Sequence, residues 1–148
     1  MNKGRLLAID YGKRRTGIAV SDPLQIIAQG LATVPTGELL NYLESYMKAE
    51  PVERVVVGRP LQTTGEESEN AARADEFIRA FKKRFPTVPV DTADERFTSV
   101  LAHDAMLQSG IGRQKRRDKA LVDRISATII LQSYMESRRM AHTINDNR

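Results

Sequence analysis

The stretch LLAIDYGKRRTGIAVSD, residues 6–22, holds two apolar segments joined by a short charged turn. This pattern predicts two short strands. The first strand ends at Asp10, and the cations Lys13, Arg14 and Arg15 follow within the turn. A carboxylate and three cations at the end of a buried strand make this turn the first candidate for a functional site.

The rest of the chain predicts helices that alternate with strands. In chain order, we expect a strand at 29–34, a helix that Thr36 caps and Pro51 ends, a strand at 55–57, a helix with a capping box at 64–67, a strand at 88–91, and helices at 98–108 and 119–135. Three strands followed by alternating helices and strands indicate an α/β fold. We expect a mixed five-stranded sheet, antiparallel at its start and parallel later, with helices on both faces.

The length and composition favour one small intracellular domain. The 148 residues contain no cysteine, which excludes thiolate nucleophiles, disulfides and cysteine-ligated zinc and fits a reducing compartment. No apolar run approaches the ~20 residues that a membrane span needs. We expect a cytoplasmic protein without a membrane partner, with one domain at residues 1–137 and a polar, disordered tail at residues 138–148.

The net charge of +4 is unevenly distributed along the chain. Residues 1–20 hold five cations and one acid, and residues 113–119 hold five cations and one acid. Two basic clusters are consistent with a polyanion partner and equally with a solvated surface.

Three acids stand beside basic or small residues at the edges of predicted elements. Asp10 ends the first strand, Glu95 follows the fifth strand, and Asp123 lies in the first turns of the last helix. Taken singly, each acid is explained as a turn residue or as a favourable charge near a helix N-terminus. Taken together around one crevice they would repel one another unless a cation lay between them. Carboxylate oxygens suit Mg²⁺ or Mn²⁺, and two such ions can promote in-line displacement at phosphorus.

Four motifs, DYGKRRTGIAVSD, VVVGRPLQTTGEES, DERFTS and KALVDRISATIILQSYM, resemble in order and spacing those of the YqgF-type family. The resemblance runs from about Leu6 to Met135. It implies a ribonuclease-H-like fold and a divalent-metal nuclease site. The family's acidic positions fall on Asp10, Glu95 and Asp123, and these would be the catalytic and metal-binding residues.

Further positions in these motifs predict contacts with nucleic acid or sharp turns. Gly12 and Gly17 would allow a tight turn and a close approach, and Gly58 and Pro60 would shape the end of the fourth strand. The predicted phosphate contacts are Lys13, Arg14, Arg96, Arg113, Lys115, Arg116, Arg117 and Lys119. Arg15 receives no role. Arg59, where family members often have an apolar residue, has either a phosphate contact or no role.

The resemblance implies a nuclease acting on structured RNA, with the precursor of 16S rRNA as the main substrate and ribosomal precursor particles as partners. A resolvase that cuts four-way DNA junctions as a dimer is the alternative, because two strands must be cut symmetrically. A non-catalytic RNA-binding factor stays open as a third function, and the oligomeric state, monomer or weak homodimer, stays open too. The Asp-x-Gly turn also resembles the phosphate-binding hairpin of actin-like and sugar kinases, but those proteins bind ATP between two such domains.

Overall fold

A computed structural model describes residues 4–59, 66–94 and 118–146 of the chain. Five strands form one sheet in the order β3-β2-β1-β4-β5. The strands are β1 (Arg5–Asp10), β2 (Arg15–Ser21), β3 (Ala28–Pro35), β4 (Val52–Arg59) and β5 (Val90–Asp94). The pairs β1/β2 and β2/β3 are antiparallel, and the pairs β1/β4 and β4/β5 are parallel. The predicted mixed five-stranded sheet is therefore confirmed.

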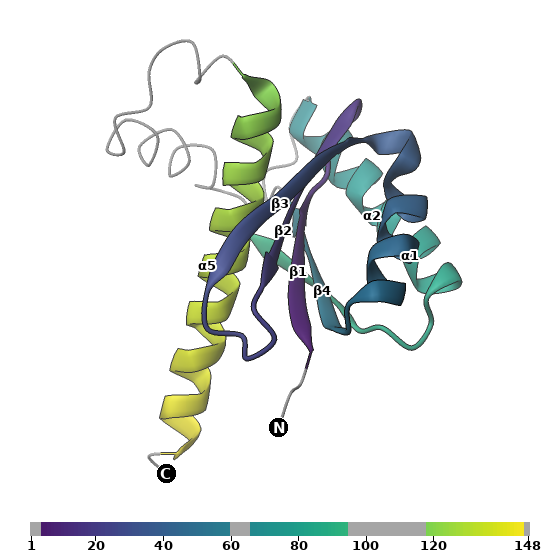
Figure 1. Cartoon of the computed structure of the whole chain (residues 1–148). Helices are drawn as coiled ribbons and strands as arrows, with labels where there is room; N and C mark the ends of the chain where they lie inside the picture. The colour runs from purple at the N-terminus through teal and green to yellow at the C-terminus, as the bar shows by residue number, and fades with distance from the viewer. Residues whose placement is uncertain (1–3, 60–65, 95–117, 147–148) are drawn as a thin grey trace.

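Helices cover both faces of this sheet, as the sequence predicts (Figure 1). A short 3-10 helix, η1 (Thr36–Glu38), leads into α1 (Leu39–Ala49). Helices α1 and α2 (Glu66–Arg84) lie on one face, and the long helix α5 (Lys119–Asp146) crosses the other (Figure 1). Residue side chains that alternate along a strand must therefore face either the α1/α2 layer or α5.

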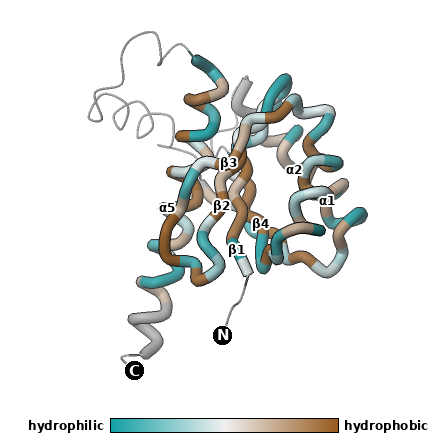
Figure 2. The backbone as a smooth tube through the Cα atoms, viewed as in Figure 1, coloured by the Kyte–Doolittle hydropathy of each residue, from teal (hydrophilic) through white to brown (hydrophobic). Residues whose placement is uncertain are grey.

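The alternation is visible in the two apolar clusters that flank the sheet. Leu7 and Ile9 of β1 pack in the cluster beneath α1 and α2, whereas Leu6 and Ala8 pack in the cluster beneath α5. Figure 2 shows the hydrophobic strands between the helical layers. Asp10 has the same parity as Leu6 and Ala8, so the pleat of β1 directs its side chain to the α5 face.

Two local predictions are wrong. Thr36 does not cap α1, because its hydroxyl group donates a hydrogen bond to the backbone oxygen of Gly12 and η1 precedes the helix. The last helix does not end near Met135 but continues to Asp146, so the backbone of residues 138–146 is helical and not disordered. Good helix formers continue past Met135, and Arg139 donates a hydrogen bond to the backbone oxygen of Ile26. The division at residue 137 stays a prediction.

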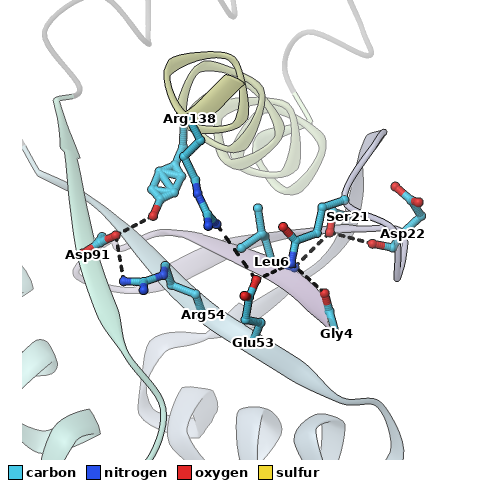
Figure 3. A network of polar contacts seen from close by, with 10 residues as sticks. Gly4, Leu6, Ser21, Asp22, Glu53, Arg54, Asp91 and Arg138 are labelled. Carbon is cyan, nitrogen blue, oxygen red and sulfur yellow. Dashed lines mark hydrogen bonds and ion pairs between the residues drawn. The ribbon is translucent and has the colours of Figure 1, made fainter. Parts of the chain in front are cut away.

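A polar network attaches the middle of α5 to β4 and β5 (Figure 3). The phenol of Tyr134 donates a hydrogen bond to Oδ2 of Asp91, and Arg54 donates a second one to the same oxygen at 3.0 Å. Arg138 pairs with Glu53 at 4.0 Å. Because these contacts come from α5 and two neighbouring strands, they orient the helix that carries Asp123.

We expect Tyr134→Phe to lower the free energy of unfolding by about 1 kcal/mol at neutral pH, because a hydrogen bond to a carboxylate is lost. Burial, with the Asp91 carboxylate, raises the pKa of Tyr134 from 10.0 to about 12. Because the pKa is raised in the folded state, the stabilisation from the Tyr134 hydroxyl is complete below about pH 10 and is lost as the pH rises toward 12. Urea unfolding of both proteins at several pH values measures the difference, which should shrink over that interval. The control is Tyr42→Phe, since burial alone raises the pKa of Tyr42.

Candidate active site at the end of strand β1

Asp10 and Asp123 lie over the same point of the sheet. Asp10 is the last residue of β1 and pairs with Gly17 of β2. Directly opposed residues of antiparallel strands point to the same face. A Cβ atom on Gly17 would lie 2.1 Å from the backbone oxygen of Asp123 and 3.0 Å from its Cβ, so α5 crosses β2 with Asp123 on Gly17. Asp10 and Asp123, far apart in the chain, therefore both lie next to Gly17 on the α5 face.

Arg15 is the counter-ion of Asp123. Its Nε donates a hydrogen bond to Oδ2 of Asp123. The Asp123 side chain is 18% exposed and the Arg15 side chain 41% exposed. Burial raises the pKa of the Asp123 carboxyl, while the hydrogen bond and charge of Arg15 and the charge of Lys119 act against that rise. Arg15 thus provides the positive charge that a mostly buried carboxylate needs.

The donor set at this place suits a hard divalent cation. Both residues carry carboxylate oxygens, the kind of ligand that Mg²⁺ and Mn²⁺ prefer, and both lie next to Gly17 on one face of the sheet. Within the described ranges, no three side chains of the His, Cys, Asp and Glu types gather closely enough to hold a metal ion. Glu95, the third predicted ligand, lies outside those ranges. Asp10 and Asp123 are therefore the two members of the predicted triad whose positions are described.

The turn between β1 and β2 presents two cations beside Asp10. The side chains of Lys13 and Arg14 are exposed. A Cβ atom on Gly12 would lie 2.4 Å from the backbone oxygen of Arg15, so the turn closes only with glycine at that position. Thr36 holds the turn from outside, because its hydroxyl donates to the Gly12 oxygen at 2.7 Å and its backbone N–H to the Arg14 oxygen at 3.0 Å. The cations therefore project from an anchored turn.

The first turn of α5 is also anchored. Oδ1 of Asp118 accepts hydrogen bonds from the backbone N–H groups of Ala120 and Leu121, at 3.1 and 3.3 Å, and caps the helix. The hydroxyl of Thr33 in β3 donates to the backbone oxygen of Ala120 at 2.6 Å. This cap has a signal in the sequence that our prediction did not use, because an Asp directly before a helical pattern is a usual capping residue.

The remaining predicted residues divide into described and undescribed ones. Gly58 is buried in β4 and pairs with Ala93 of β5. Arg59 grips both carboxylate oxygens of Asp75 in α2, at 3.0 and 3.2 Å, so its contact in this structure is an ion pair within the protein. Lys119 is exposed at the start of α5. The predicted residues outside the described ranges are Pro60, Glu95, Arg96, Arg113, Lys115, Arg116 and Arg117.

Comparison with known proteins decides the family. A sequence model of the RuvX family, described as Holliday junction resolvase, matches residues 4–137. The chain belongs to the RuvX family. A relative from Bacteroides thetaiotaomicron, named "Putative pre-16S rRNA nuclease", is 60% identical over 135 residues, which cover 91% of this chain and 98% of the relative. A relative of the same name from Bacteroides fragilis is 58% identical over 136 residues, covering 92% and 99%. The YqgF-type resemblance is therefore confirmed.

The fold of this RuvX family member is similar to that of RuvC. The structure of Thermus thermophilus RuvC in complex with a Holliday junction substrate superposes with a TM-score of 0.57 at 16% identity, covering 89% of this chain and 96% of that chain. This similarity confirms the ribonuclease-H-like fold and shows the fold alone. Among the described residues, no helix is long and apolar enough to span a membrane.

Proposed function

We propose that the chain is a divalent-metal-dependent nuclease that hydrolyses phosphodiester bonds of structured RNA, with 5′-end processing of pre-16S rRNA as its main role. The observation that supports this proposal most directly is the convergence of Asp10 and Asp123 over Gly17. Two acids from different elements lie next to one glycine, and their carboxylate oxygens are suitable ligands for a divalent cation.

In this proposal Asp10, Glu95 and Asp123 hold Mg²⁺ or Mn²⁺ through their carboxylate oxygens. A bound divalent ion supplies an activated water and a positive charge that stabilises the leaving oxygen. The chain contributes the fixed positions of the ligands. Thr36 anchors the turn after Asp10, and the Asp118 cap and the Thr33 bond anchor the helix of Asp123.

Exposed cations beside this centre would bind the nucleic-acid backbone. Lys13 and Arg14 project from the turn, and Lys119 begins the helix that carries Asp123. An arginine can grip a phosphate with two parallel hydrogen bonds, and a lysine adds a point charge. Arg96, Arg113, Lys115, Arg116 and Arg117 are proposed contacts by family resemblance and by charge. Because phosphates carry no base sequence, these contacts favour recognition by backbone shape and charge.

We expect Arg14→Ala to weaken RNA binding and to reduce the slope of log Kd against log salt concentration by about 1, since one phosphate contact is lost. Fluorescence anisotropy with a labelled RNA hairpin at several salt concentrations measures both effects. The matched control is Lys48→Ala, which removes one exposed cation from α1 on the other face of the sheet. An unchanged slope in Arg14→Ala would contradict a phosphate contact at this residue.

The names of the relatives favour pre-16S rRNA, whereas the family description and the RuvC complex favour a four-way DNA junction as the alternative substrate. The junction role would require a dimer. The test offers purified protein a 5′-extended 16S rRNA fragment and a four-way DNA junction, each with Mg²⁺ or Mn²⁺. We expect cleavage of the RNA that stops on removal of the ion. Paired cuts in the junction with intact RNA would overturn the RNA substrate, and no cleavage of either would favour a non-catalytic RNA-binding factor.

A further inference from the structure

The contact between Arg15 and Asp123 conflicts with metal binding at the same carboxylate. Arg15 donates its Nε hydrogen to Oδ2 of Asp123. Asp123 is one of the two described acids of the proposed centre, and its side chain is mostly buried. A divalent ion on this carboxylate would place two positive groups within a few ångströms in a partly desolvated site, where like charges repel strongly. An ion at Asp123 would therefore be repelled by Arg15 for as long as this contact persists.

Arg15 is positioned so that it can leave Asp123. It is the first residue of β2, its side chain is 41% exposed, and it directly follows the exposed cations Lys13 and Arg14. The side chain of the first residue of a strand can rotate toward solvent without disturbing the backbone pairing of that strand. The rotated side chain would join Lys13 and Arg14 in one cationic group beside Asp10.

We propose that Arg15 is an internal substitute for the metal cation: it occupies Asp123 when no ion is bound and leaves that carboxylate when a nucleic-acid phosphate draws it away. This inference rests on the proposed function and goes beyond it, because it couples two binding events. A phosphate that takes Arg15 frees Asp123 for the ion, and an ion that displaces Arg15 supplies one more cation for the phosphate. By linkage, nucleic acid and metal must then strengthen each other's binding by the same factor.

The test measures Mn²⁺ affinity by calorimetry for the full chain, alone and with a short RNA duplex that gels show to stay intact during the titration. For the wild-type chain we expect the RNA to tighten Mn²⁺ binding at least ~5-fold. Arg15→Gln removes the competitor, so it should bind Mn²⁺ at least ~5-fold more tightly than wild type without RNA and gain little from RNA. Arg15→Lys keeps the charge and should keep the weaker affinity. The charge-matched control is Arg84→Gln, which removes an arginine paired with Glu44 in α1.

The inference is overturned if Arg15→Gln is folded by circular dichroism and binds Mn²⁺ no more tightly than wild type. That result would mean that Arg15 only orients Asp123 and so supports metal binding. If Arg15→Gln does not fold, the wild-type chain decides, since an RNA-independent Mn²⁺ affinity contradicts the coupling. The proposed function fails separately. The proposed function fails if Asp10→Asn and Asp123→Asn retain Mn²⁺ binding and cleavage. The inference alone fails if these two variants lose Mn²⁺ binding but Arg15→Gln does not bind Mn²⁺ more tightly than wild type.

Discussion

Asp10→Asn and Asp123→Asn are each expected to lower the rate of metal-dependent RNA cleavage by at least ~1000-fold, because each removes a charged ligand worth several kcal/mol of transition-state stabilisation. Asp10 pairs with Gly17, and α5 crosses the same glycine at Asp123. Initial rates on a 5′-extended 16S rRNA fragment at saturating Mg²⁺ measure the effect. Because asparagine has nearly the same shape as aspartate, both variants should fold.

The matched control for these variants is Glu44→Gln. Glu44 lies in α1 on the opposite face of the sheet and pairs with Arg84. The Glu44→Gln variant removes one carboxylate from the chain without touching the proposed centre. Its cleavage rate should therefore stay within about twofold of wild type, as expected for a surface change. Full activity in Asp10→Asn or in Asp123→Asn, with Glu44→Gln also active, would remove that carboxylate from the proposed centre.

Gly17→Ala is expected to have the second large effect, on stability as well as on activity. The added Cβ would lie 2.1 Å from the backbone oxygen of Asp123, a distance that backbone atoms cannot accommodate without moving α5. Overpacking of this kind costs about 3 kcal/mol, or a fall in Tm of ~10 °C for a chain of this size. A shift of α5 by ~1 Å would also lower cleavage ~100-fold, since the ligands would no longer be aligned.

Thermal unfolding and cleavage of Gly17→Ala should be compared with those of Gly37→Ala. Gly37 lies in η1, and a Cβ atom there would meet nothing within 4 Å. The control should change the free energy of unfolding by less than about 0.5 kcal/mol. If Gly17→Ala were as stable and as active as Gly37→Ala, the close crossing of α5 over β2 would be wrong.

The sheet and its helical layers were predictable because their signals are local. The alternation in residues 6–22, the run Val55–Val57 and the helical spacing after Pro35 each report a single element. The first and second strands then pair through a short turn, so the register that sets Asp10 opposite Gly17 follows from near neighbours. The mixed topology follows from the order of the elements.

The partners of the functional side chains were not predictable in the same way. Arg15 and Asp123 are 108 positions apart, and no local pattern pairs them. Thr36 has the residue type of a helix cap, but a tertiary contact with the Gly12 oxygen uses its hydroxyl instead. Past Met135, helix α5 consists of good helix formers and also makes contacts such as that of Arg138 with Glu53, and a single sequence does not reveal such contacts.

The most direct test of a metal centre at Asp10 and Asp123 is anomalous diffraction at the manganese edge from crystals of the full chain soaked in Mn²⁺. We expect an anomalous peak bound by carboxylate oxygens of Asp10 and Asp123, with the Arg15 guanidinium no longer on Asp123. Saturating Mn²⁺ with no peak between these two acids, and Arg15 still bound to Asp123, would contradict such a centre.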